Sequence, residues 1–158
     1  DEAGVSVGSL YQYFPNKDSL LVALTRRHIE STTAGLKHLL GQMSVASGFD
    51  TILRQVVDFL VKQHDLDDLH LLVMHQAPRT IEISVELERA KSQLVDLAEQ
   101  LLVSRINDPH RRTLVARMVV ATIDAGVHDV ILRQPRGKVR KTATDITIST
   151  ALSIIERS

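Results

Sequence analysis

The stretch that decides the fold is AGVSVGSLYQYFPNK, residues 3–17. Its first glycine can adopt a positive φ at little cost, which suits the end of a preceding helix. Ser6 is a good N-cap for a helix that begins at Val7, and apolar residues then recur at helical spacing. Pro15 ends this short helix, and Asn16 can cap the next one. The pattern predicts the turn and the second helix of a helix-turn-helix.

The other face of this short helix carries small, polar or aromatic side chains and no acidic one. A helix with such a face can enter the major groove of DNA. Gly8 and Ser9 lie near its start and would approach base edges, and the amide of Gln12 suits a bidentate contact with adenine. The alternative is a short helix with solvated polar residues and a packed tyrosine.

Residues 3–17, continued by Asp18-Ser19-Leu20-Leu21, resemble the DNA-binding motif of the tetracycline-repressor-like (TetR) family of bacterial regulators. The specific part is Tyr-x-Tyr-Phe followed by Asn-Lys, directly after a Gly-Val-Ser turn. The resemblance implies that Tyr11, Tyr13 and Lys17 contact DNA phosphates, which fix the register of the protein on DNA. It also implies a further helix and a half before the first residue, so we expect the N-terminal part of the protein to be missing here.

Composition indicates a helical protein without thiol chemistry. Apolar residues make up 44% of the 158 residues and aromatic residues only 3%, with few glycines and prolines, which suits helices packed through Leu, Val, Ile and Ala. Cysteine is absent, which excludes disulfides and is compatible with a reducing cytosol. No apolar run approaches the roughly 18 residues that span a membrane. We therefore expect a cytoplasmic protein with no membrane contact. The formal net charge is zero, so composition alone does not indicate nucleic acid.

Hydrophobic periodicity predicts an all-α fold, with a helix-turn-helix remnant followed by a helical domain. The resemblance implies that this second part is a ligand-binding and dimerisation domain. The small-residue loop 44–48 is the expected boundary between residues 1–43, with the connecting helix, and residues 44–158. The expected helices cover about 17–40, 51–64, 68–76, 85–101, 109–133 and 138–156, and the expected caps after Asn16 are Asp50, Ser84 and Asp108.

The helix over 109–133 is unusually apolar. From Met118 to His128 it is apolar nearly all the way round, which is typical of a helix buried on every side. A chain this short cannot easily surround it, so a partner subunit could cover the remaining face. Together with the helix over 138–156 it forms the candidate homodimer surface, which pairs as a four-helix bundle in the family that the chain resembles.

Several residues of the central helices are candidates for an effector pocket. Flexible or bulky apolar side chains can line such a pocket, although plain core packing is the alternative. Asp124 and His128 are an i, i+4 pair that could bond each other, cross the dimer interface or face a ligand. Thr122 could offer a hydroxyl to a ligand, although a threonine often bonds its own helix. The candidate effector-binding residues are Phe59, Met74, Met118, Thr122 and His128.

Two further charged segments are expected to be structural. A polar cluster suggests metal binding, but a helix break and unfavourable spacing argue against a ligand set, and no His-Glu-x-x-His pattern is present. The basic run over 133–141 follows a helix C-terminus, where cations are favoured. We therefore expect no metal and no cofactor. The cluster comprises His64, Asp65, Asp67, Asp68, His70 and His75.

The sequence thus predicts a ligand-responsive transcriptional regulator and not an enzyme. As is most common in the family it resembles, it would be a repressor that binds a palindromic double-stranded DNA operator as a dimer. A small-molecule effector would favour a state that releases DNA. Two alternatives remain: an all-helical metal-dependent hydrolase, and a helical dimerisation module with no DNA role.

Overall fold

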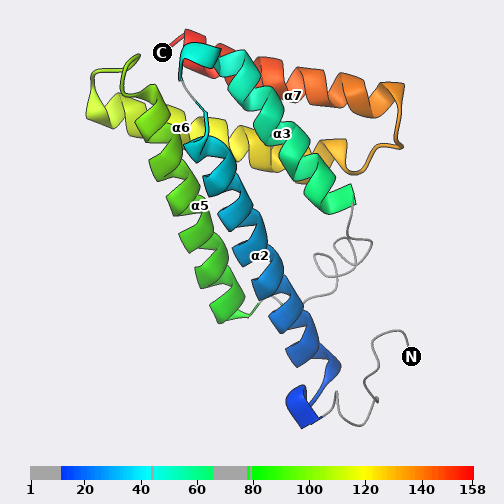
Figure 1. Cartoon of the computed structure of the whole chain (residues 1–158). Coiled ribbons are helices and arrows are strands. Elements are labelled where there is room, and N and C mark those ends of the chain that lie inside the picture. Colours follow the sequence, from blue (N-terminus) through cyan, green and yellow to red (C-terminus); the bar gives the residue numbers. More distant parts are fainter. Residues whose placement is uncertain (1–11, 44, 66–77, 79) are drawn as a thin grey trace.

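The computed structural model describes residues 12–43, 45–65, 78 and 80–158 (Figure 1). Every regular element within these ranges is helical, as predicted. None of these helices is both long and apolar enough to cross a membrane. The elements are α2 (Lys17–Gly41), a 3-10 turn η1 (Val45–Ser47), α3 (Phe49–Asp65), α5 (Ile81–Leu102), α6 (Pro109–Ala125), a π-helical turn η2 (Gly126–Ile131) and α7 (Lys138–Glu156).

The helices form a body from which one pair extends. α2 and α5 lie side by side and reach away from α3, α6 and α7 (Figure 1). α5 also packs against α6, and α7 packs against both α6 and α3. The beginning of α2 therefore lies far from the body, and its later turns lie within it (Figure 1).

Two of the predicted helix starts are confirmed by their caps. The Asn16 side chain accepts a hydrogen bond from the Ser19 backbone N–H at 2.8 Å, and the Ser19 hydroxyl accepts from the Asn16 N–H at 3.3 Å. This reciprocal capping box fixes the start of α2. At α6, Asp108 accepts from the His110 N–H at 3.0 Å, with Pro109 at the first helical position. Each cap stabilises its helix by about 1 kcal/mol.

Two other predicted caps are wrong. Thr80 caps α5 by accepting from the Ile83 N–H at 3.3 Å, whereas Ser84 lies inside the first turn and donates to the Thr80 carbonyl at 3.1 Å. α5 starts earlier because this start buries Ile83 in the core. α3 begins at Phe49, so Asp50 lies within its first turn, where a carboxylate favours the positive helix end. The predicted helix over 68–76 lies outside the described residues.

The core lies where α3, α6 and α7 meet the later turns of α2. Leu36 of α2 and Val57 of α3 are buried, as are Ala116 of α6 and Ile148 and Ala151 of α7. Burying a large aliphatic side chain contributes about 1.5–3 kcal/mol, so this contact layer holds the body together. The core is built from aliphatic residues, as composition predicted.

The helix predicted over 109–133 changes character at Gly126. α6 ends at Ala125, and the chain continues as a π-helical turn in which the Leu132 N–H donates to the Val127 carbonyl at 3.0 Å. A Cβ at Gly126 would lie 2.3 Å from Cγ2 of Thr147, so glycine allows α7 to approach this closely. Isolated π-helical turns are frequent at functional sites. Here the turn carries His128.

The described part of the chain leaves one face of this helix uncovered, as expected for a chain too short to surround it. Val119 and Ile123 are buried, but Leu114 is 62% exposed and Met118 is 55% exposed. Together with Ala121 and Ala125 these two residues form an outward stripe along α6, and Ile146 of α7 is exposed as well. We call this set the α6–α7 stripe. It leaves an apolar surface of α6 without cover from the described part of the chain.

Candidate functional site

A cavity of about 600 Å³ lies between α2, α3, α5 and α6. Its volume is in the range of small-molecule binding pockets, roughly 300–1,000 Å³. Most of its wall is aliphatic, and each of the surrounding helices also contributes polar side chains. Representative apolar lining residues are Ile29, Leu36, Ile52, Leu53, Leu94 and Ile123.

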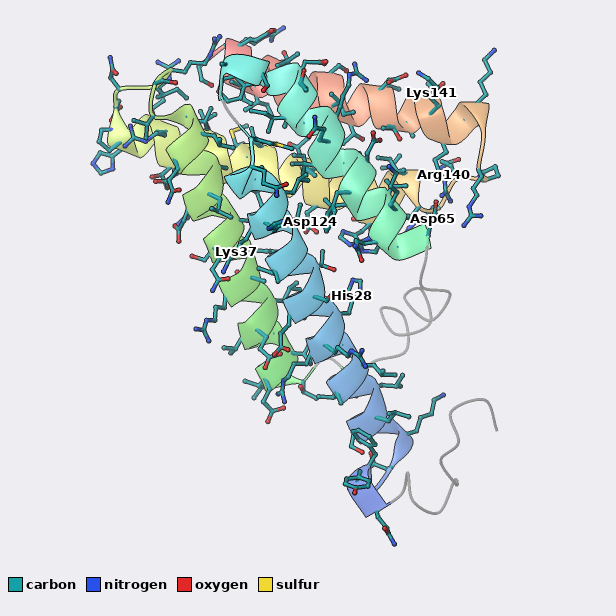
Figure 2. All side chains as sticks on the ribbon, viewed as in Figure 1. His28, Lys37, Asp65, Asp124, Arg140 and Lys141 are labelled. Atoms are coloured by element: carbon teal, nitrogen blue, oxygen red, sulfur yellow. The ribbon has the colours of Figure 1, made fainter. Side chains whose placement is uncertain are left out.

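Five polar side chains of the cavity lining, from five elements, form a connected chain. Lys91 Nζ of α5 lies 2.9 Å from Oδ2 of Asp124 in α6, whose Oδ1 lies 2.9 Å from Nδ1 of His128 in η2. His128 Nε2 lies 3.1 Å from Nε2 of His64 in α3. The His64 ring meets the His28 ring of α2 edge-on, with 5.1 Å between centroids. We call these five residues the polar chain. Figure 2 labels Asp124 and His28.

The hydrogen-bond partners assign the protons along the polar chain. His64 Nδ1 donates to the Leu60 carbonyl, which leaves its Nε2 as an acceptor. His128 therefore donates through Nε2 to His64, and through Nδ1 to Asp124. An imidazole that donates through both nitrogens is an imidazolium. The polar chain thus holds His128 in its charged form.

Electrostatics agree with this assignment. Burial lowers the pKa of His64 to about 4, so His64 is neutral at pH 7. Burial acts to lower the pKa of His128, but the hydrogen bonds to Asp124 and the negative charge of Asp124 together outweigh burial and raise that pKa. For Asp124, burial acts to raise the pKa, but hydrogen bonds from His128 and Lys91 lower it to about 2. At neutral pH the site holds two cations and one anion between them.

Of the five predicted effector residues, His128 lines the cavity. Phe59 instead packs against α2, where a Cβ at Gly35 would lie 2.4 Å from its Cζ. Met118 faces outward, and the Thr122 hydroxyl donates to the Met118 carbonyl at 2.7 Å, within its own helix. Neither residue lines the cavity, because α6 presents its other face there. Met74 lies outside the described residues.

Sequence reasoning missed most of the polar lining. The sequence places His64 in the polar cluster and gives no signal for Lys91, yet both line the cavity. On α2, Thr25, His28 and Thr32 also line it. Their spacing of three and four residues puts these polar groups on one face of a largely apolar helix, which is the signal that could have found them.

Both charged segments that were expected to be structural contain residues that form ion pairs. Within the described ranges, no group of three or more His, Cys, Asp or Glu residues could hold a metal ion. Asp65 instead accepts from Nη1 of Arg140 at 2.7 and 2.9 Å (Figure 2). In the basic run, Arg133 pairs with Asp129, one helical turn earlier. Lys141 pairs with Asp145, one helical turn later. Asp67, Asp68, His70 and His75 lie outside the described residues.

Three of the six predicted DNA-contacting residues are described, and they lie at the outer end of α2. Gln12 and Tyr13 are exposed just before the helix, and Lys17 is its exposed first residue. The capping box of Asn16 and Ser19 holds this end of the helix. Gly8, Ser9 and Tyr11 lie outside the described residues. The contacts of all six residues with DNA stay predictions.

Comparison with known proteins identifies the N-terminal segment. Residues 1–24 match the model of a family described as bacterial regulatory proteins, tetR family. The N-terminal segment is therefore similar to the TetR family. The matched residues contain every predicted DNA contact, and they end within α2, which goes on to line the cavity.

Two curated relatives extend the similarity into the helical body. Both are nucleoid occlusion factor SlmA from Haemophilus influenzae, one from strain PittGG and one from strain ATCC 51907. Each is 29% identical over 106 residues, which covers 62% of this chain and 47% of the relative. The chain therefore spans about half the length of the curated relatives it matches.

Proposed function

We propose that this chain is part of a DNA-binding transcriptional regulator that acts as a homodimer and responds to a small molecule. One observation carries the proposal. α2 continues directly from the segment that matches the TetR family and then forms one wall of a ligand-sized cavity. A single rigid helix thus joins the DNA-reading segment to the place where a ligand would bind.

DNA reading is assigned to the segment before α2. Gly8, Ser9 and Gln12 would face base edges, where an amide such as that of Gln12 pairs with adenine. Tyr11, Tyr13 and Lys17 would contact phosphates and set the position of the protein on the duplex. Two copies would place two such segments in successive major grooves of a palindromic operator.

The α6–α7 stripe supports the homodimer. Leu114 and Met118 expose large apolar surfaces next to the small side chains of Ala121 and Ala125. Small residues allow two helices to approach closely, and large exposed apolar patches mark interaction sites. Ile146 extends the surface onto α7. A second copy of the same surface would bury the stripe.

The response to ligand follows from the position of α2. α2 forms part of the cavity wall through Thr25, His28 and Thr32. A ligand shifts a protein between states only if it binds one state more tightly, so an effector that fits one tilt of α2 would favour one spacing of the DNA segments. Release from DNA on binding makes the protein a repressor. A regulator of chromosomal genes works in the cytoplasm.

Fluorescence anisotropy with the full-length protein and its own promoter DNA tests the proposal. We expect sequence-specific binding at moderate salt that weakens as salt rises. Lys17→Ala should weaken binding to every sequence, whereas Gln12→Ala should change the preferred base at one position in each half-site. Lys62→Ala on the exposed face of α3 is the control and should change neither. Equal binding to promoter and random DNA would refute the proposal.

A further inference from the structure

The cavity has an uneven distribution of polar groups. Lys91, Asp124 and His128 lie together at its edge, with side chains 28–38% exposed, and most of the remaining wall is aliphatic. A molecule that fills this space must bury an apolar body and carry one polar end. Burying a second polar group against the aliphatic wall would cost free energy without a partner.

The polar end offers hydrogen-bond donors in excess. The ammonium of Lys91 has three N–H donors, of which Asp124 accepts one, whereas both N–H groups of His128 are donated to Asp124 and His64. Because Asp124 contacts both cations, one negative charge is set against two positive charges.

Two other acidic residues of the lining do not change this balance. Asp129 is paired with Arg133 at 3.0 Å and its side chain is 65% exposed. Glu88 lies on the exposed face of α5. Charges in contact with water are screened, whereas half-buried groups are screened less. The group that would complete the polar end is therefore an acceptor with a negative charge.

We propose that the cavity binds an amphipathic carboxylate, with the apolar body among the aliphatic side chains and the carboxylate on the Lys91 ammonium, beside the charged ring of His128. The inference deepens the proposed function and rests on it. The ligand carboxylate would compete with Asp124 for the Lys91 ammonium, which in the unliganded chain joins α5 to α6. Binding would then exchange an ion pair between helices for an ion pair with the ligand.

Three probes of one chain length test the charge of the polar end: decanoate, 1-decanol and decylamine, each below its micellar concentration. Titration calorimetry at pH 7 should show decanoate binding about tenfold more tightly than decanol, because a charge-assisted hydrogen bond is stronger than a neutral one. Decylamine should bind most weakly. Decanoate should also raise Tm most.

Two substitutions and a control assign the effect to the polar chain. Lys91→Met keeps the length of the side chain and should abolish the advantage of decanoate over decanol. Asp124→Asn removes the competing carboxylate but also the partner that raises the pKa of His128, so it should change decanoate binding less than Lys91→Met does. Lys62→Met, on the exposed face of α3 and outside the cavity lining, should leave all three affinities unchanged. The residues are half-exposed or exposed, so each variant should fold, and its circular dichroism melt checks this.

Three results would overturn the proposal: decanol or decylamine binding as tightly as decanoate, no binding of any probe, or an unchanged decanoate advantage in Lys91→Met. A DNA readout separates this failure from failure of the proposed function. If the full-length protein binds its promoter and decanol releases it while decanoate does not, the ligand class is wrong and the regulator stands. If promoter DNA is not bound without any probe, the regulator itself is refuted.

Discussion

Two aspartates of this molecule each lie between two cationic side chains, but the two sites differ in how firmly their partners are held. Asp65, at the end of α3, is held by Arg136, which precedes α7, and by Arg140 within α7. Asp124 is held by Lys91 and His128 at the cavity. Arginine stays protonated at every relevant pH and matches a carboxylate in shape, whereas lysine and histidine are mobile or titratable partners. The ion pairs of Asp65 hold α3 and α7 together. The proposed ligand would instead take over a partner of Asp124.

The Asp65 cluster also shows what a fixed site requires. Besides Asp65, the guanidinium of Arg140 donates to the Gln134 carbonyl at 2.8 Å and to the Leu132 carbonyl at 3.5 Å. Its side chain is only 15% exposed. Burial acts to raise the pKa of Asp65, but Arg140 and Arg136 outweigh burial and lower it. A group with this many partners cannot leave one of them for a ligand without losing the others.

Breaking the fixed cluster should give the largest effect. Arg140→Met leaves Asp65 and two backbone carbonyls without their donor, and we expect about 3 kcal/mol less free energy of unfolding. Urea denaturation at pH 7.5 measures it. Arg133→Met, which removes an exposed pair with Asp129, should cost less than about 0.5 kcal/mol. Equal losses in the two variants would show that the cluster is no more fixed than a surface ion pair.

Acid should act on the polar chain through His64. Its pKa is about 4 in the folded chain and 6.5 in the unfolded chain, so the unfolded chain binds more protons as pH falls below 6.5. Between pH 7.5 and 5.0 this lowers the free energy of unfolding by about 2 kcal/mol. His64→Gln should remove that part of the pH dependence, whereas His38→Gln at an exposed position should retain it. An unchanged slope in His64→Gln would contradict the assignment.

His128 should act in the opposite direction. Because its pKa is raised in the folded chain, it stabilises the fold fully below pH 6.5, and this contribution is lost as pH rises through the raised pKa. His128→Gln should therefore lose less stability than the parent between pH 6.0 and 8.5, as measured by urea denaturation. A steeper loss in the variant would mean that His128 is neutral in the folded chain.

The smallest effect is expected from the exchangeable pair itself. Lys91→Met removes a half-exposed ion pair and should change the free energy of unfolding by about 0.5 kcal/mol at most. Thermal melts of parent and variant at equal ionic strength measure it. A loss near that of Arg140→Met would place Lys91 among the fixed partners and would argue against its exchange with a ligand.

The features that sequence predicted are those set by neighbours in the chain. The caps Asn16 and Asp108 and the helix over 138–156 follow from local side-chain hydrogen bonds and periodicity, and the structure confirms them. Thr80 displaced Ser84 as a cap because packing of Ile83 moved the helix start. Local rules give approximate helix boundaries, which tertiary packing then adjusts.

The cavity could not be predicted in the same way. Met118 and Thr122 lie on the same helix as Asp124, but the rotation of α6 in the body decides which of them face inward. The π-helical turn that carries His128 has no reliable local signal, and its Gly126 is explained only by contact with Thr147 on another helix. Lys91 and Asp124 meet across 33 positions of sequence. Each of these contacts depends on the packed body.

The length of α2 has a mechanical consequence. Its 25 residues make a rod of about 37 Å at 1.5 Å per residue, and His28 contacts the polar chain about 16 Å from Lys17. If the rod pivots at the cavity, a tilt of about 7° carries its outer end about 2 Å sideways. In a symmetric dimer the two ends move together, so their separation changes by up to about 4 Å against a half-site spacing of about 34 Å. α2 would then act as a lever arm that pivots where it contacts the cavity wall.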